Sequence, residues 1–454
     1  MRQKRKRQMN IFHGSFKNDI GKELKVMSQI LDETPEVLNQ VYNDLIGLKK
    51  NDVGRTGMSA EQVLRCTILK QYRDLSYEEL AFHLEDSQSF RAFSRLEMRQ
   101  YPSGSTLQEN IKALREETWE QINQLVMGYA QGQGMEKGQK VRLDSTGVES
   151  NIHYPTDATL LQDAIRVITR LLAEGHQLVP RPDYRFSDHN RVVKKRVFKI
   201  KNTKKEKERQ VAYQDLLHIA DQVRGYALEA IAALQIYASD GPEQIIFVRH
   251  LTADLERAVG LLGRIIQQTR RRVIYGEKVP ASEKVVSFFE DHTDIIDKGQ
   301  REVLYGHKVF LTGGKSGLIL DCLIERGNPA DTDLFIPLLE RQKHLYGKVP
   351  LQTAADGGFA SLDNLSRAKL LGVKDVSFSK KRGLSVLEMV KSQWVYKQLK
   401  NFRAGIEANI SRLKRAFGLT RCTWTEWDGF KQYVWSAVVS YNLSLLAKLE
   451  LAKA

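Results

Sequence analysis

A long helical block divides two strand-rich parts of this chain, and that order constrains the fold more than any other feature. Strand-like sequence comes first in "QKVRLDSTGVESN", where Val141 and Leu143 lead to Asp144. From Asp157 to about Gln268, apolar residues recur at helical spacing. Strand signals return only after "VIYGEKVP". The two strand-rich parts must therefore meet across the helical block if they are to form one sheet.

Setting the helical block aside leaves a recognisable order of elements. "HKVFLTGGKSGLILDCLIERGN" predicts two strands joined by a turn, and "VPLQTAADGGF" predicts a later strand that ends at Asp356. The whole order is three strands, helix, strand, helix, strand and two helices, which is that of an RNase H-like mixed sheet with flanking helices. We expect residues 139–154 and 301–454 to form this domain, with residues 155–300 as a mostly helical insertion after its first strand.

The first 135 residues have a different, all-helical pattern. Residues 22–50 are periodic, and Ser-x-x-Glu or Ser-x-x-Gln capping boxes begin at Ser76 and Ser105. The second box is expected to open one long helix that reaches about Tyr129. Short capped helices joined by tight turns favour a helix-turn-helix-like DNA-binding region over residues 1–135. An ordinary helical bundle fits the same spacing.

The charge balance indicates a polyanionic partner. Lys plus Arg is 70 and Asp plus Glu is 55, which gives a formal net charge of +15. Such a chain meets nucleic acid or an anionic membrane surface. No apolar run approaches the ~20 residues needed to cross a bilayer, so we expect no membrane partner. Three widely separated cysteines, Cys66, Cys322 and Cys422, match neither a disulfide framework nor a zinc site and indicate a reduced, cytoplasmic protein.

Residues 191–209 form the most basic stretch of the chain. They include ten Lys or Arg and two Glu, so their net charge is +8. We expect Lys194, Lys195, Arg196 and Lys199 to contact DNA phosphates there, because such contacts need charge and carry no sequence information. A solvated and partly disordered loop is the alternative.

Two aspartates follow apolar strand sequence and precede small residues. Asp144 stands before "STG" and Asp356 before "GG". In an RNase H-like order the first and fourth strands are neighbours, so the two carboxylates can share a divalent metal such as Mg²⁺, which prefers hard oxygen ligands. The glycines after Asp356 would let a phosphate or backbone approach closely.

A basic segment near the C-terminus carries one isolated acid. "KNFRAGIEANISRLKRAFGLTR" holds six basic side chains and Glu407. On a helix, Arg403, Glu407 and Lys414 lie within about 40° of one another. We expect Glu407 to be a third metal ligand. Arg403 and Lys414, which lie beside it on the helix, would contact the phosphates of DNA. The alternative is an intrahelical ion pair with Arg403, which would contribute ~0.2–0.5 kcal/mol.

These segments resemble bacterial insertion-sequence transposases that carry a DDE triad, and most of all the ISNCY family. The likeness lies in "DSTGVESNIHYPTDATLLQDAIRVITR", "TAADGGFAS" and "FRAGIEANISRLKRAFGLTRC", around the three acids. The last segment includes the Arg-x3-Glu-x6-Lys signature of related transposases. "LSYEELAFHLEDSQSFRAFSRL" resembles their N-terminal helical region. Some relatives have a Tyr where this chain has Lys400, which places any stacking role of that Tyr in doubt.

The resemblance implies a site and a reaction. Asp144, Asp356 and Glu407 would be the catalytic ligands of two Mg²⁺ ions, with Mn²⁺ as the alternative ion, and Arg403 and Lys414 would contact DNA near the cut. Water would cleave the element ends, and the freed 3′-hydroxyls would attack target DNA. The partners would be double-stranded DNA, as terminal inverted repeats and target, and a second copy of the chain on that DNA, at the bacterial nucleoid. An inactive or repurposed DNA-binding protein and a nuclease that never joins strands are the rival functions.

Overall fold

The chain forms two compact units in a computed structural model. The structure describes residues 2–5, 18–47, 57–179, 182–237, 241–297 and 303–453. The first unit combines residues 1–151 with residues 306–454, and the second consists of residues 152–305. The N-terminal and C-terminal parts of the sequence thus fold together, and a separate unit is inserted between them.

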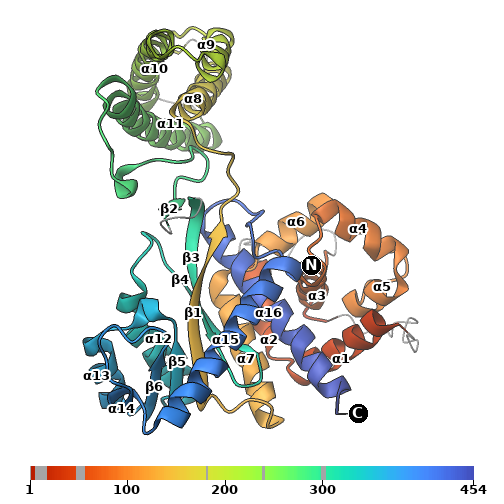
Figure 1. Ribbon diagram of the computed structural model, residues 1–454. Coiled ribbons are helices and arrows are strands. Elements are labelled where there is room, and N and C mark those ends of the chain that lie inside the picture. Colours follow the sequence, from red (N-terminus) through yellow and green to blue (C-terminus); the bar gives the residue numbers. More distant parts are fainter. Residues whose placement is uncertain are drawn as a thin grey trace. The chain divides into compact units, whose positions relative to one another are not determined.

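A mixed sheet lies at the centre of the first unit (Figure 1). Its strands are β1 (Lys140–Glu149), β3 (Leu304–Gly313), β4 (Ile319–Ile324), β5 (Gln352–Ala355) and β6 (Asp375–Phe378). The order is β2-β3-β1-β5-β6, where β2 is the short strand Asp294–Ile296, and β4 pairs with β3 off this path. β1 pairs antiparallel with β3, and β3 with β4, whereas β1 pairs parallel with β5, and β5 with β6. The predicted pairing of the strand before Asp144 with the strand before Asp356 is confirmed.

Helices from the C-terminal half cover this sheet. One long helix, α15 (Gln393–Ala416), packs along β1, β5 and β6. Shorter helices α12 (Asp331–Tyr346), α13 (Leu362–Leu370) and α14 (Val386–Met389) share an apolar core with β5, β6 and the first half of α15. The single turn Gly357–Phe359 joins β5 to α13. This layer fixes the ends of β1 and β5 against one face of α15.

The N-terminal helices pack around the last helix, α16 (Trp427–Leu451), which is apolar on all sides and almost wholly buried. α1, α3 and α7 contact it directly, and α16 and α7 both contact β4. One hydrophobic core runs through these helices and the outer strands. The N-terminal helical region is therefore part of the first unit. Its elements are α1 (Asp19–Glu33), α2 (Val37–Ile46), α3 (Ala60–Tyr72), α4 (Tyr77–Asp86), α5 (Gln88–Ser94), α6 (Gly104–Lys112) and α7 (Glu116–Gly132).

The expectation of one long helix from Ser105 to Tyr129 was wrong. Ser103 caps α6 by accepting a hydrogen bond from the Thr106 amide at 3.3 Å, and α6 ends at Lys112. A new helix begins after Arg115, whose backbone N–H donates to Asp44 at 2.9 Å and whose guanidinium donates to the same carboxylate at 2.7 Å. This long-range contact redirects the chain between the two helices.

The predicted helix over residues 22–50 is also interrupted. It divides into α1 and α2 around Pro35, because proline has no N–H to donate and disfavours helical geometry in the residue before it. Residues 48–50 of that prediction lie outside the described part of the chain.

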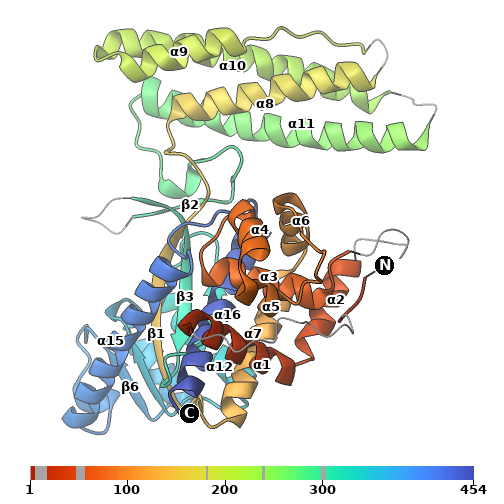
Figure 2. The same ribbon diagram turned by 90° about the vertical axis from the view of Figure 1, so that its right-hand side faces the viewer.

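The second unit is built on four helices. They are α8 (Asp157–Leu178), α9 (Asn190–Asn202), α10 (Glu206–Gln235) and α11 (Pro242–Thr269), which pack side by side over a common apolar core (Figure 2). A π-helical turn (Arg270–Ile274), a 3-10 turn (Ala281–Glu283) and the short strand β2 (Asp294–Ile296) follow. The basic stretch 191–209 folds as α9 and the start of α10, so its described structure is helical.

The structure also bears on the predictions about membrane-spanning segments and cysteines. In the described ranges, no helix combines the length and the apolar character needed to cross a bilayer. Cys66, Cys322 and Cys422 are buried in a hydrophobic core, and in the part of the chain that the structure describes they form no disulfide.

Candidate active site

Three carboxylates from distant parts of the sequence surround one guanidinium, that of Arg403 on α15. Its Nη2 lies 2.9 Å from Asp144 Oδ2 and 3.1 Å from Asp356 Oδ1. Its Nη1 lies 2.6 Å from Glu407 Oε1. The structure thus brings together all three acids that the sequence singled out, with the predicted basic neighbour among them.

Asp144 does not end its strand, which corrects the sequence interpretation. β1 continues to Glu149, and Asp144 lies opposite Leu311 on β3. The parallel pairing of β1 with β5 does end there, since its last pair is Leu143 with Ala355. The small residues after Asp144 had suggested a strand end, but the antiparallel partner β3 holds them in the sheet. Asp144 is therefore at the rim of the parallel half of the sheet.

Asp356 follows β5 directly, as expected. Its Oδ1 accepts a hydrogen bond at 2.8 Å from the hydroxyl of Ser379, which lies just after β6. That hydroxyl accepts in turn from the Gly357 amide at 2.8 Å. Asp356 is consequently fixed by the ends of two neighbouring parallel strands, and its side chain remains 40% exposed.

α15 supplies the third acid and two bases. Phe402, Ile406, Leu413 and Phe417 anchor the helix as predicted, with the last three buried. Glu407 is 60% exposed, so it can turn toward solvent or a ligand. Its contact with Arg403 is the intrahelical ion pair that was the alternative interpretation. The role of Glu407 as a metal ligand stays a prediction. Lys414 Nζ donates to the Gly147 carbonyl of β1 at 2.8 Å.

Electrostatics differ between the two aspartates. Burial raises the pKa of Asp144 to about 6, against the lowering effects of the Arg403 charge and the Ser145 amide. Burial also acts on Asp356, but hydrogen bonds from Ser379 and from the amides of the following glycines, together with the Arg403 charge, outweigh it, and the pKa of Asp356 is below its usual value. Asp144 is therefore the carboxylate that depends most on a nearby cation to stay ionised.

Two family models match the chain, and both describe transposases. The model "Transposase DDE domain" matches residues 280–443, and "Transposase domain (DUF772)" matches residues 15–113. The chain is a DDE transposase. Neither match identifies the ISNCY family, so that narrower assignment stays a prediction. No curated protein and no solved structure matches the chain.

The donor set of the transposase suits a divalent metal in chemical type. Three carboxylates offer hard oxygen ligands, and the guanidinium of Arg403 shows that a cation can be held among them. The guanidinium of Arg403, however, sets the spacing of the three carboxylates. Across the residues that the structure describes, no three His, Cys, Asp or Glu side chains lie close enough together to ligate an ion. Metal binding would require Arg403 to leave the aspartates.

A fourth carboxylate beside the site escaped the sequence analysis. Asp331, at the start of α12, accepts a hydrogen bond from Lys308 Nζ at 3.0 Å and contacts the Ser145 hydroxyl at 3.4 Å. A Cβ on Gly358 would lie 2.4 Å from Asp331 Oδ2, so glycine is needed where this carboxylate approaches the turn after Asp356. In sequence, an acid in the first turn of a helix signals only a favourable helix dipole, so nothing marked Asp331.

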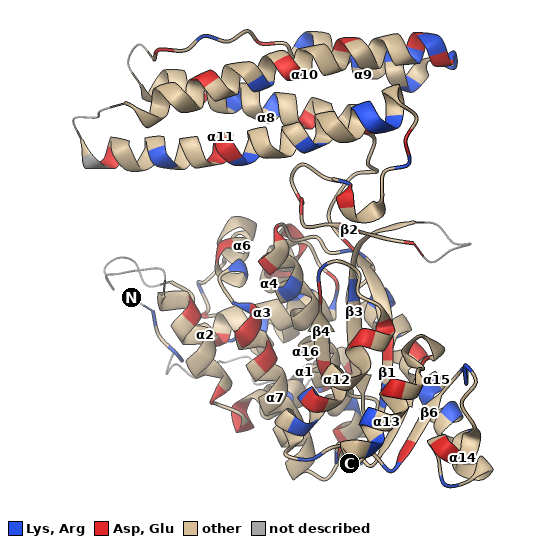
Figure 3. Ribbon diagram, turned by 90° about the vertical axis from the view of Figure 1, so that its left-hand side faces the viewer, with Lys and Arg blue, Asp and Glu red and all other residues tan. Residues whose placement is uncertain are grey.

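The other expected DNA contacts come from other elements. Lys194, Lys195, Arg196 and Lys199 belong to α9 of the second unit, where Arg196 pairs with Asp215 at 3.1 Å (Figure 3 colours all Lys and Arg blue). In the N-terminal region, α3 is buried along almost its whole length. The exposed residues of α4 are mostly acidic: Glu78, Glu79, Glu85 and Asp86. Neither of these two helices suits a groove lined by phosphates.

Proposed function

We propose that this transposase binds the terminal inverted repeats of its own insertion sequence, cleaves the element ends by metal-dependent hydrolysis, and joins the 3′-hydroxyl ends to target DNA. The observation that carries the proposal is the convergence of Asp144, Asp356 and Glu407 on one guanidinium, although Asp144 and Arg403 are 259 positions apart in the chain. We also propose that the mixed sheet is RNase H-like, on the strength of the parallel pairing of β1 with β5.

The proposed roles follow from exposure and from partners. Asp144 and Asp356 would hold two Mg²⁺ ions from the rigid sheet, and Glu407 would complete the site from a more exposed position on α15. When bound, such ions activate the attacking hydroxyl and stabilise the leaving oxygen of an in-line displacement. Arg403, once freed from the aspartates, would reach a phosphate beside the cut, because a guanidinium donates to phosphate oxygens in the same bidentate geometry as to carboxylates.

Lys414 has a supporting role in this proposal. Its ammonium donates to the Gly147 carbonyl, three residues beyond Asp144, and thereby joins α15 to β1 near the site. The contact would keep Glu407 in place against the sheet. A phosphate that approached Gly147 could share the same ammonium, which has three donors.

End recognition is proposed for the N-terminal helical region between Ser59 and Tyr129. Since α3 is buried and α4 is acidic on its exposed face, the surface left for DNA is α5, α6 and the segment between them. That segment exposes Met98, Arg99 and Tyr101. An arginine and an aromatic side chain can bind a phosphate or a base edge. The basic α9 of the second unit would add phosphate contacts without sequence preference.

Strand transfer is the decisive experiment. Purified transposase is mixed with labelled duplex that carries an element end, a supercoiled plasmid and Mg²⁺, and the labelled products are resolved by size. Labelled end joined to plasmid supports the full proposal. Cleaved end without joined product identifies a nuclease, and binding without cleavage identifies an inactive or repurposed DNA-binding protein. The assay also separates a dimer, which joins two ends to one plasmid, from a single-ended reaction.

Cellular location follows from the substrate in this proposal. The element and its target lie in chromosomal or plasmid DNA, so the transposase would act in the bacterial cytoplasm at the nucleoid. A tagged copy that remains with DNA after gentle lysis, and leaves it at high salt, would support that location.

A further inference from the structure

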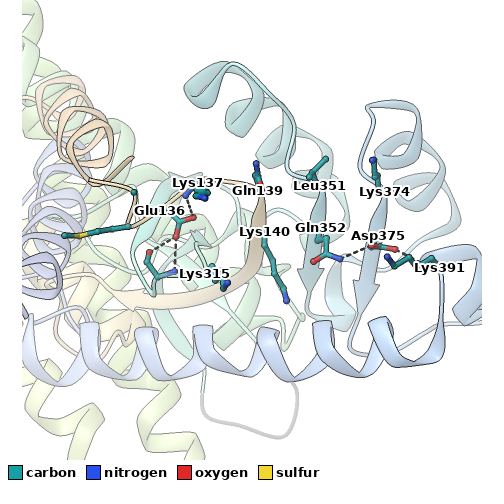
Figure 4. Close-up of a pocket in the computed structure, with 13 residues that line it drawn as sticks. Glu136, Lys137, Gln139, Lys140, Lys315, Leu351, Gln352, Lys374, Asp375 and Lys391 are labelled. Carbon is teal, nitrogen blue, oxygen red and sulfur yellow. Dashed lines mark hydrogen bonds between the residues drawn. The ribbon is translucent and has the colours of Figure 1, made fainter. Parts of the chain in front are cut away.

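A basin of lysines lies at the end of the sheet opposite the three carboxylates. It is a cavity of about 850 Å³ in the first unit. Its walls carry Lys137, Lys140, Lys315, Lys374 and Lys391 (Figure 4). No sequence motif marked these residues, because they come from four separate segments of the chain.

The acids of the basin are hydrogen-bonded to uncharged donors of the protein. Glu136 is 4% exposed and accepts hydrogen bonds from the amides of Lys137 and Gly138 at 2.9 Å and from the Ser316 hydroxyl at 2.6 Å. Asp375 is 5% exposed and accepts from the Gln352 amide group at 2.9 Å and from the Lys391 backbone at 3.1 Å. Both carboxylates are turned toward these donors (Figure 4). They are occupied before any lysine ammonium could pair with them.

The ammonium groups have no such partners. Lys137, Lys315, Lys374 and Lys391 are exposed, and within the described ranges none of their ammoniums forms an ion pair or a hydrogen bond. Lys140 is half-buried and lies over the Phe402 ring at 4.6 Å. Burial, and then the positive charge of Lys315, lower its pKa. Repulsion among like charges thus remains uncompensated in the protein alone.

The geometry of the basin suits a row of phosphates. Lys140, Gln352 and Asp375 are in register at the starts of three adjacent parallel strands. Adjacent strands are ~4.8 Å apart, so the row spans about 10 Å. One strand of duplex DNA carries a phosphate every ~3.4 Å along its axis. Ammoniums spread along such an edge face several phosphates, whereas a single small anion would need them to converge on one point.

We propose that this lysine basin, built around Lys137, Lys315 and Lys374, is a second DNA-binding site of the transposase, and that it holds the phosphate backbone of duplex DNA without regard to sequence. Asp144 follows Lys140 by four positions, which is about 13 Å along β1. The basin and the three carboxylates are therefore at opposite ends of the parallel pairing of β1 with β5. The inference rests on the proposed function only in that DNA is taken as the polyanion.

The test compares two variants with the same loss of charge. One is K137Q/K315Q/K374Q. The matched control is K22Q/K25Q/K453Q, whose lysines are exposed on α1 and at the end of α16, away from the basin. Affinity for a duplex of scrambled sequence is measured without metal across a range of salt, and thermal melting checks that both variants fold. Each lost phosphate contact reduces the slope of log affinity against log salt by about 0.9.

We expect the basin variant to lose about two to three units of slope and the control to keep the wild-type slope. An unchanged slope in the basin variant, or an equal loss in both variants, overturns the inference. Inorganic phosphate that raises the melting temperature of the wild type but not of the basin variant, without any change of slope, would assign the basin to a small anion instead.

Cleavage of an end duplex with Mg²⁺ is measured separately for the wild type and the control. A wild type that does not cleave, together with a reduced slope in the basin variant, would remove the proposed function and retain the second DNA site. The two hypotheses can therefore fail independently.

Discussion

The two ends of the central sheet hold charge in opposite ways. At the rim of the β1–β5 pair, three carboxylates share Arg403, and every charged group has a partner within the protein. At the starts of the same strands, lysine ammoniums surround a cavity whose carboxylates are already occupied by other donors. At the first end each carboxylate has a partner, although three carboxylates share one guanidinium and keep a formal net charge of −2 (three negative, one positive). At the second end the ammoniums gain partners only when something else binds.

This difference indicates how each end would respond to its ligand. A metal or a phosphate at the carboxylate end must first displace an existing ion pair, so binding there is an exchange. A phosphate at the lysine end displaces only counterions, so binding is favoured by their release and falls steeply with salt. The first end suits selection of a particular ligand, and the second suits general attachment to DNA.

The largest effect is expected from removal of the acids. D144N, D356N or E407Q should each lower cleavage by about a thousandfold or more, which corresponds to about 4 kcal/mol in the activation barrier, because each removes a metal-binding charge. Binding to end DNA, measured by gel shift, should persist. D363N is the matched control, since Asp363 is exposed on α13 and pairs only with Arg367. Near-normal cleavage by any one of the three variants would remove that residue from the site.

A change at Arg403 tests whether a metal ion must displace the guanidinium from the aspartates. R403Q removes the cation that occupies the aspartates, so Mn²⁺ affinity in the absence of DNA should rise about tenfold, or by about 1.4 kcal/mol. Electron paramagnetic resonance of free Mn²⁺ during a titration measures this without any turnover. R415Q, which removes an exposed arginine from the same helix, should leave Mn²⁺ affinity at the wild-type value. Equal affinities in wild type and R403Q would show that the guanidinium does not compete with metal.

A change at Gly358 tests whether its close contact with Asp331 positions the turn that follows Asp356. G358A places a Cβ 2.4 Å from Asp331 Oδ2, so either the turn after Asp356 or α12 must move, and we expect cleavage to fall about tenfold because the aspartate is misplaced. G128A on α7 is the control, because nothing lies within 4 Å of its Cβ. Melting temperature is measured for both. Cleavage by G358A at the wild-type rate would mean that the Asp331 contact does not position the site.

The basic helix α9 should show the smallest effect, confined to general DNA affinity. K194Q/K195Q/R196Q/K199Q should make the salt slope shallower by roughly two to four units, and by similar amounts for end and scrambled DNA. The loss of slope should be nearer two units than four, because Arg196 already pairs with Asp215. Weakening limited to end DNA would show that α9 reads bases. No change of slope would mean that α9 does not touch DNA.

The sequence predicted the acids of the site better than their surroundings. Apolar runs placed Asp144 and Asp356 on neighbouring strands, and helical periodicity placed Glu407 beside Arg403. The sequence did not reveal that Arg403 would also contact both aspartates. A local pattern carries no information on strand register or on the angle at which α15 crosses the sheet. Asp331 was missed for the same reason, since its role depends on the turn at Gly358.

Long-range packing also explains the errors in the N-terminal region. The contact between Arg115 and Asp44 ends a helix that periodicity alone would continue. The burial of α3 removes one candidate recognition helix from the N-terminal region that short capped helices had favoured for DNA binding. The second outcome depends on α16, which packs against α3 although it is far from α3 in the sequence.

The dependence of the first helices on the last one has a consequence for synthesis. At ~5–20 residues per second, a ribosome needs tens of seconds to extend the chain from α7 to α16. Throughout that interval the apolar faces of α1, α3 and α7 lack the helix that covers them. A nascent chain in this state is open to chaperones and proteases, and a chain that terminates before Trp427 never closes its core. Completion of translation is thus itself a condition for an intact enzyme, and a premature stop codon anywhere upstream of α16 should silence the gene product outright.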